Sequence, residues 1–178
     1  MRPYYEWNLK KDKFVKHPKP PRKHFKVSYR LAKNYDKKLL FAFEKECVKT
    51  EPEILKPEYE YIKKKLRTIR TMNFNRAKEF KVIIALVADK VVGELSMSWY
   101  FNPEINSKVG IIIGLWVLKP YRMAGIGSGL INFAKKEFRK MGIKRIELVV
   151  GLFNRAALAF YQKLGFEIKR IGRASLNF

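Results

Sequence analysis

The chain has 178 residues, of which 47% are hydrophobic, and it carries a formal net charge of +23 at pH 7. A chain of this length and apolar content is expected to bury a core rather than stay disordered. Its single cysteine excludes an internal disulfide and any multi-cysteine metal site, so we expect no metal cofactor. No run of about 20 apolar residues is present and the first residues lack an apolar signal segment, so we predict a cytoplasmic protein that does not bind a membrane.

The positive charge allows two interpretations. A field of this sign attracts polyanions, so a weak electrostatic contact with nucleic acid is one expectation. The other is an ordinary solvated surface, because the lysines are spread along the chain, and the richness in lysine and isoleucine hints at a thermophilic source.

Residues 1–24 are predicted to form a basic arm rich in proline and lysine, outside a folded domain that spans residues 25–178. The prolines of this segment interrupt helices and strand pairing. Within the domain, residues 25–31 alternate as in a strand. Asp36 then lies where a helix N-cap is expected, and a second helix is predicted from about Pro57.

The middle of the chain changes to the period of strands. Residues 82–88 are almost continuously apolar, Asp89-Lys90 supplies a turn, a second strand begins at Val91, and a third spans 109–118. Alternation sorts the second strand into two faces: Leu95, Met97, Trp99 and Phe101 on one, and Glu94, Ser96, Ser98 and Tyr100 on the other.

The last third is predicted to contain a helix over 127–141, a buried strand over 145–150, a helix over 154–164 and a strand over 166–171. The resulting order, β-α-α-β-β-β-α-β-α-β, indicates an α/β (α+β) protein with a mixed sheet flanked by helices.

A glycine-rich turn lies between the third strand and the amphipathic helix that follows it. Glycines let the backbone approach a ligand closely, and the free N–H groups at a helix start, together with the helix dipole, form an anion site without charged side chains. An arginine at the beginning of the turn would add a charge-assisted contact. The spacing of the glycines matches neither the Walker A nor the dinucleotide pattern. The turn comprises Arg122, Met123, Ala124, Gly125, Ile126, Gly127 and Ser128.

Two segments resemble signatures of the GCN5-related N-acetyltransferase (GNAT) family. Residues 117–127 read V-L-K-P-Y-R-M-A-G-I-G, which is similar to the family's acetyl-CoA signature, Arg/Gln-x-x-Gly-x-Gly/Ala after a strand. Residues 154–166 read N-R-A-A-L-A-F-Y-Q-K-L-G-F, which looks like its second signature, N-x-x-A-x-x-x-Y-x-x-x-G-F. The resemblance implies a mixed, mostly antiparallel sheet in which two parallel strands splay apart to form the acetyl-CoA cleft.

The resemblance also implies roles for individual residues. The backbone of Leu115, Trp116 and Val117 would bind the pantetheine arm of acetyl-CoA, and Met123 to Ser128 would wrap its pyrophosphate. Asn154 would bind the cofactor arm, and Tyr161 would protonate the departing thiolate, for which a phenol with a pKa near 10 is suited.

The general base is where the chain departs from some members of the family. Positions that carry a catalytic acid in certain relatives align with Ile111 and Val149, which are both apolar. Glu94 is therefore the candidate base, with Glu104 in the following loop as another. The alternatives are that Glu94 is an exposed carboxylate without a role, or that the substrate amine loses its proton to solvent.

The predicted function is N-acetyl transfer from acetyl-CoA to a primary amine, on a protein N-terminus, a lysine or a small molecule. Two alternatives remain open: a basic nucleic-acid-associated protein that uses the same fold, and a non-catalytic CoA-binding regulator. The resemblance also implies a last strand after Phe166, yet only twelve residues follow it. This strand is expected to come from a small hairpin over 166–178, or the edge is covered by the N-terminal arm or by a partner's strand. Both a monomer and a homodimer are consistent with this pattern.

Overall fold

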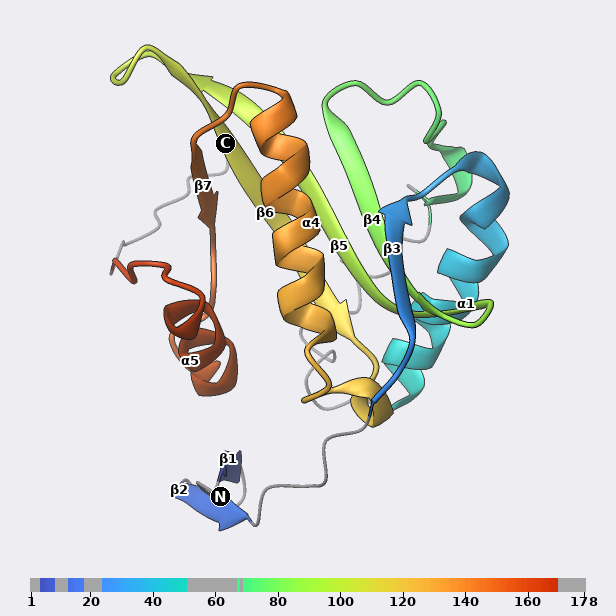
Figure 1. Cartoon of the computed structure of the whole chain (residues 1–178), viewed down its shortest axis with the longest axis vertical. Helices are drawn as coiled ribbons and strands as arrows, with labels where there is room; N and C mark the ends of the chain where they lie inside the picture. Colours follow the sequence, from blue (N-terminus) through green and yellow to red (C-terminus); the bar gives the residue numbers. More distant parts are fainter. Residues whose placement is uncertain (1–3, 9–12, 18–23, 51–66, 68, 170–178) are drawn as a thin grey trace, which may run out of the picture. The chain divides into compact units, whose positions relative to one another are not determined.

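A computed structural model describes residues 4–8, 13–17, 24–50, 67 and 69–169 (Figure 1). The chain divides into two compact units, Arg22–Val149 and a second unit made of Met1–Pro21 with Val150–Phe178. Within the described ranges, no helix has the length and apolar character needed to cross a membrane. The predicted boundary between arm and domain stays a prediction.

The larger unit is built on a five-stranded sheet with the order β3-β4-β5-β6-β7. Neighbouring strands are antiparallel except β6 and β7, which are parallel, so the mixed, mostly antiparallel sheet is confirmed. The strands are β3 Val27–Leu31, β4 Phe80–Val87, β5 Lys90–Asn102, β6 Ser107–Val117 and β7 Arg145–Leu148.

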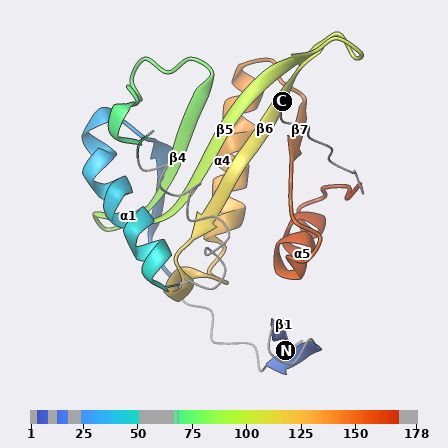
Figure 2. The same ribbon diagram turned by 180° about the vertical axis from the view of Figure 1, so that it is seen from behind.

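Among the described helices, a long one covers each face of this sheet. Helix α4, Ile126–Lys140, packs over β3, β4, β5 and β6, and α1, Lys37–Thr50, contacts β5 from the opposite side (Figure 2). The apolar stripe of α4 is fully buried, as its period predicts. Burial of each Leu, Ile or Phe side chain contributes about 1.5–3 kcal/mol, so this stripe fixes α4 on the sheet: Leu130, Ile131, Ala134 and Phe138.

Asp36 immediately precedes α1, but it does not act as the predicted N-cap. Its buried carboxylate accepts hydrogen bonds from both terminal nitrogens of Arg30, at 2.6 and 2.7 Å, and from the backbone N–H of Lys33 at 2.8 Å. Burial alone would raise the pKa of this carboxyl, but these hydrogen bonds outweigh it, so the pKa lies below its ordinary value. The stability that the ionised form contributes is lost as the pH falls through that lowered pKa.

Several predicted elements differ from those observed. The turn before β5 is Ala88-Asp89, one residue earlier than predicted, with Ala88 at a positive φ of 50°. The strand predicted over 145–150 ends at Leu148, and Val149 is 96% exposed rather than buried. The helix predicted from Pro57 lies mostly outside the described residues.

The smaller unit contains a hairpin and a helix. Strands β1, Tyr4–Asn8, and β2, Lys13–His17, pair antiparallel, so the predicted arm does contain strand structure. Because Pro3 and Pro18 flank the strands instead of interrupting them, the ladder keeps its donors. Helix α5, Arg155–Lys163, matches the prediction, whereas residues 166–169 form no strand and the rest of the predicted hairpin lies outside the described residues.

Candidate functional site

Strand β6 continues past the end of its partner β7. The two strands pair from Val109 with Arg145 to Ile112 with Leu148, and β6 then runs on to Val117 with no described strand on that side. On its other side, β6 stays paired with β5 to its last residue. The larger unit therefore has an open strand edge over residues 113–117, where Figure 1 shows the ribbons of β6 and β7 separating.

A β-bulge lies at the point of separation. The ladder pairs Ser96 with Gly114 and Met97 with Ile112, so Ile113 is an extra residue on β6. An extra residue bends its strand and increases the local twist. Because Ile113 directly follows the last residue that pairs with β7, the bulge explains why the two parallel strands stop pairing there.

The open edge presents backbone groups of alternate residues. The N–H of Leu118 donates to the carbonyl of Val92 on β5 at 2.9 Å. Since strand residues alternate in direction, Trp116 also faces β5, while Leu115 and Val117 face the open edge. Three residues were predicted to offer their backbone groups to a ligand. The backbone groups of Leu115 and Val117 point toward the open edge, as this requires, and those of Trp116 do not.

The open edge leads through a short 3-10 helix, η3 Lys119–Tyr121, into the glycine-rich turn and α4. Gly125 is the N-cap of α4 with φ 81°, and no side chain caps the helix. The first intrahelical bond is donated by Gly129 to Gly125, so the N–H groups of the three residues between them have no acceptor within the helix. These free donors lie at the positive end of the helix dipole, where the sequence analysis predicts an anion site, and that site stays a prediction.

Gly129 allows another element to approach the start of α4. A Cβ at this position would collide with the hydroxyl end of the Tyr29 side chain on β3. The contact holds the first turn of α4 against the sheet. Burial raises the pKa of the Tyr29 phenol, which therefore stays protonated at neutral pH.

Arg122 is held beside the strand that precedes it. Its Nε donates to the carbonyl of Val117 at 2.8 Å, and its guanidinium lies 5.4 Å from the centre of the Trp116 ring. The indole Nε1 of Trp116 is buried and makes no hydrogen bond to any described residue. Arg122 thus orders the exit of β6, a role that the sequence did not indicate.

Glu94 lies beneath α1 and not at the surface. Its side chain is on the same face of the sheet as Ile84 and Trp116, its partners on the neighbouring strands, and it is only 2% exposed. The alternative of an exposed carboxylate is therefore wrong, because α1 covers the face that the alternation marked as polar. Glu94 contributes to a small hollow whose other lining residues, among those that the structure describes, are apolar: Leu40, Ile69, Met72, Phe74, Phe80 and Val82.

Phe74 lines this hollow, and the sequence analysis did not predict its place there. Asn34 accepts a hydrogen bond from the backbone N–H of Phe74 at 2.8 Å and donates to Asn73 at 2.9 Å. These bonds tie the loop before β4 to the turn before α1. The cluster of asparagines around Phe74 was the available signal, since such residues hydrogen-bond to backbone groups in loops.

In the smaller unit, Asn154 and Tyr161 lie on α5 and at its start. The Oδ1 of Asn154 accepts from the N–H of Ala157 at 3.0 Å, so this residue caps the helix. Tyr161 is buried and its ring packs edge-on against Phe160 and Phe166, with ring centres 5.2 and 5.6 Å away. Burial raises the pKa of the Tyr161 phenol, which keeps its proton available near neutral pH.

A sequence profile, described as the Acetyltransferase (GNAT) family, matches residues 40–166. The chain belongs to the GNAT family. This match covers the open strand edge, the glycine-rich turn and α5 together.

Ile111 lies on β6, and Glu104 lies in the exposed loop before that strand. In the part of the chain that the structure describes, no group of His, Cys, Asp and Glu residues is arranged to hold a metal ion.

Curated GNAT relatives share part of the chain. An uncharacterized N-acetyltransferase of Methanocaldococcus jannaschii is 38% identical over 80 residues, which is 45% of this chain and 35% of that protein. N-alpha-acetyltransferase 50 of Danio rerio is 38% identical over 90 residues, or 43% of this chain and 54% of that protein. The chain thus matches between about a third and about a half of the length of these relatives.

The fold is also found among solved structures. An aminoglycoside N-acetyltransferase, solved in complex with CoA, superimposes with a TM-score of 0.69 over 87% of this chain and 97% of that one, at 17% identity. At this identity the likeness shows the GNAT fold alone.

Proposed function

We propose that this GNAT protein transfers an acetyl group from acetyl-CoA to a primary amine. The observation that carries the proposal is the continuity of one surface of the larger unit. The open edge of β6 continues through η3 and the glycine-rich turn into the uncapped start of α4, so strand-like backbone groups are followed by free helix N–H groups. Acetyl-CoA has the same order of groups, with an amide-containing arm followed by a pyrophosphate.

The backbone of this surface suits both parts of the cofactor. Leu115 would pair with the pantetheine amides as a neighbouring strand does. The N–H groups of Ile126, Gly127 and Ser128 would bind the pyrophosphate. A Cβ built on Gly125 meets no atom within 4 Å, so the approach to these donors is open. Acetyl-CoA supplies the reactive thioester, and we assign the N–H of Val117 as the donor to its carbonyl oxygen.

The reaction requires two proton transfers. The amine nitrogen bonds to the acetyl carbon, the bond from that carbon to sulfur breaks, and the amine gives up a proton that we assign to Glu94, directly or through a water. The CoA thiolate takes a proton from the Tyr161 hydroxyl, as the motif around Tyr161 implies. Support comes from the burial of Glu94 beside an apolar hollow and from the protonated state of Tyr161.

The acceptor that we favour is the free N-terminus of a protein. Two relatives are named N-alpha-acetyltransferases, from Danio rerio and Arabidopsis thaliana. The described residues around Glu94 are apolar, which suits an α-amine followed by an apolar side chain. The test is the release of free thiol from acetyl-CoA with a panel of peptides, lysine-containing peptides with blocked N-termini, and small amines. Thiol release with unblocked peptides supports the proposal, and no release with any amine contradicts it.

We expect Gly125→Ala to weaken acetyl-CoA binding by about tenfold, because a residue with a side chain costs about 1–2 kcal/mol in the left-handed conformation. Gly125 has φ 81° and no atom near a Cβ, so the change affects backbone conformation without a clash. Gly142→Ala is the matched control, since Gly142 has φ 74°, equally open surroundings and a position after the far end of α4. Calorimetric titration measures both variants. Equal losses of affinity in the two variants would show that the turn has no special role.

A further inference from the structure

The end of α4 opposite the glycine-rich turn is strongly basic. The helix has 15 residues, so its two ends are about 22 Å apart. Residues 132–145 contain six Lys or Arg and one acid, Glu137. This region is therefore well separated from the proposed acetyl-CoA site, and no step of the proposed reaction uses it.

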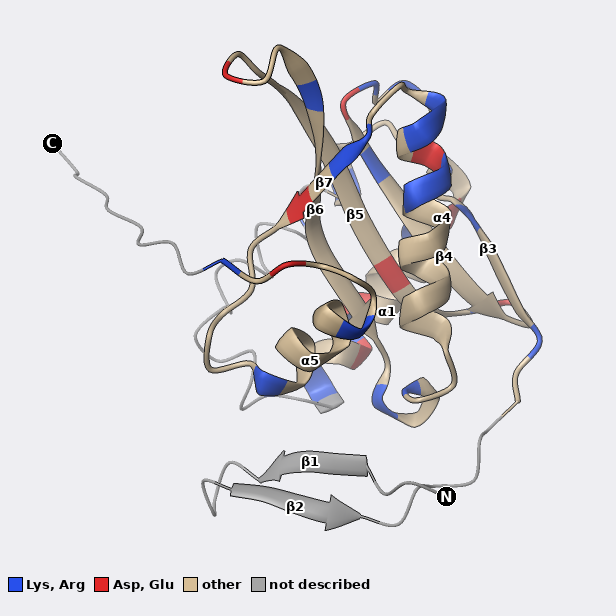
Figure 3. Cartoon of the chain, turned by 60° about the vertical axis from the view of Figure 1, so that its left-hand side comes forward, with Lys and Arg blue, Asp and Glu red and all other residues tan. Residues whose placement is uncertain are grey.

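The single acid of this region is turned inward. Glu137 is 6% exposed, and its carboxylate binds Lys140 of α4 at 2.6 Å and lies 3.8 Å from Lys81 of β4. It therefore fixes two lysines from different elements next to each other and shows little negative charge to solvent. Figure 3 shows Lys and Arg concentrated at the end of α4 and at the start of β7, while the later part of β7 carries an acid, Glu147.

Three further cations point to solvent. Lys136, Arg139 and Lys144 are exposed and make no ion pair with any residue that the structure describes. Lys136 and Arg139 are three residues apart on α4 and thus lie on one face of the helix. Their charge is not neutralised within the described part of the protein.

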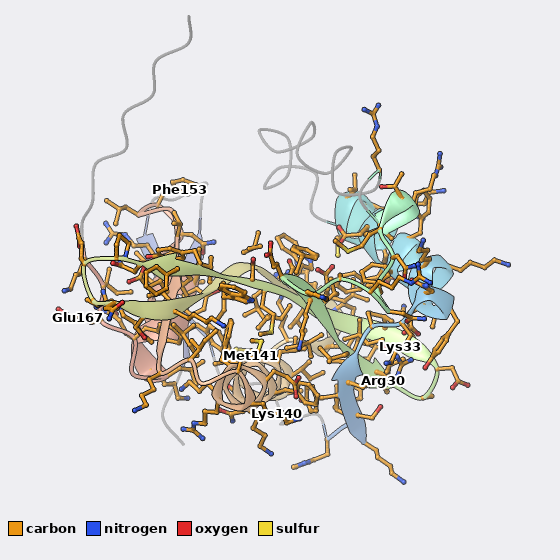
Figure 4. The ribbon with its side chains drawn as sticks, turned by 90° about the horizontal axis from the view of Figure 1, so that it is seen from above. Arg30, Lys33, Lys140, Met141, Phe153 and Glu167 are labelled. Atoms are coloured by element: carbon orange, nitrogen blue, oxygen red, sulfur yellow. The ribbon has the colours of Figure 1, made fainter. Side chains whose placement is uncertain are left out.

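An aromatic side chain lies among other lysines near the end of α4. Trp99 of β5 is partly exposed, and the Nζ of Lys108 is 4.5 Å from the centre of its ring. Trp99 lines a shallow hollow together with Lys78, Glu79, Lys81, Met97, Ser98 and Met141, so one exposed acid also lies at this hollow. Figure 4 looks onto this end of the molecule and labels Lys140 and Met141 at the end of α4.

We propose that this surface, the α4 end face, binds single-stranded RNA. We define it by Trp99, Lys108, Lys136, Arg139 and Lys144 with the hollow between α4 and β5. Exposed lysine and arginine side chains bind the phosphates of nucleic acids. An aromatic ring on the same surface stacks on unpaired bases, and proteins that bind single-stranded nucleic acid combine these two contacts. RNA offers such unpaired bases in its loops. An acidic protein would match the charge but would not use the indole ring.

The test compares two triple variants that remove equal charge. Lys136→Gln, Arg139→Gln and Lys144→Gln are combined in one, and Lys26→Gln, Lys38→Gln and Lys49→Gln, all exposed elsewhere, in the other. The probe is a fluorescent, unstructured RNA oligonucleotide, and anisotropy is followed against salt concentration. We expect the first variant to make the slope of log affinity against log salt shallower by about 2, since each lost phosphate contact removes about 0.7. The control variant should change it by much less.

A further single variant tests the aromatic contact. Trp99→Leu should weaken RNA binding about tenfold, because base stacking is lost. The salt slope should not change, because the substitution removes no positive charge. Calorimetric binding of acetyl-CoA should be unaltered in all these variants, which separates this proposal from the proposed enzymatic function. Equal effects of the two triple variants, tighter binding of duplex DNA than of the oligonucleotide, or equal competition by polyglutamate would each overturn it.

Discussion

Tyr161→Phe is expected to lower kcat about 100-fold, the lower range for loss of a general acid, and to leave the affinity for acetyl-CoA unchanged. The substitution removes only the hydroxyl, so the ring keeps its edge-on contacts with Phe160 and Phe166. The measurement is steady-state thiol release together with calorimetric titration of acetyl-CoA. A parallel loss in kcat and in cofactor affinity would point to a structural role instead.

The pH dependence follows from the burial of this phenol. Burial raises the pKa of Tyr161, so the proton needed by the thiolate remains present up to at least the ordinary tyrosine pKa of about 10. No loss of kcat caused by Tyr161 is expected between neutral pH and that value. Tyr35→Phe is the matched control, because Tyr35 is 72% exposed and should leave kcat unchanged. An equal effect of the two substitutions would contradict the assignment.

Glu94→Gln is expected to lower kcat by about 100-fold as well, since a positioned general base contributes at least that factor. The amide has nearly the same shape as the carboxylate but cannot accept the amine proton. We therefore expect the acidic limb of the pH–rate profile to disappear in the variant, with KM for acetyl-CoA unchanged. Thiol release measured across pH with the best peptide substrate gives both parameters.

A second buried carboxylate provides the control for Glu94. Glu44 of α1 is 5% exposed, compared with 2% for Glu94, so Glu44→Gln replaces a similarly buried carboxyl group in the same unit. We expect this variant to alter thermal stability more than kcat. If Glu44→Gln and Glu94→Gln lower kcat equally, or if the pH profile of Glu94→Gln is that of the unaltered protein, Glu94 is not the base.

The fold could be predicted because its signals are local. The apolar stripe of α4 and the apolar runs of β4 and β6 follow directly from side-chain period. The exact end of β7 could not, since it depends on a bulge at Ile113 that is defined by pairing between strands and not by the residues themselves. Asp36 was misassigned for a similar reason, because its partner Arg30 lies on a different element.

The candidate site could be predicted from the sequence only where its signals are local, as for the fold. The glycines of the turn and the asparagine that starts α5 are recognisable in sequence, and the structure gives both their helix-start positions. The environment of Glu94 was not recognisable, because a polar residue in an alternating strand indicates an exposed face unless another layer covers it. Here α1 is that layer, and its position is a property of the tertiary structure.

The central claim is that the open edge of β6 and the start of α4 form an acetyl-CoA site. Calorimetric titration of the full chain with acetyl-CoA tests it most directly. We predict one site per chain, with a dissociation constant between about 1 µM and 1 mM, the range of KM values of enzymes. Absence of binding over this range by protein that remains folded would contradict it.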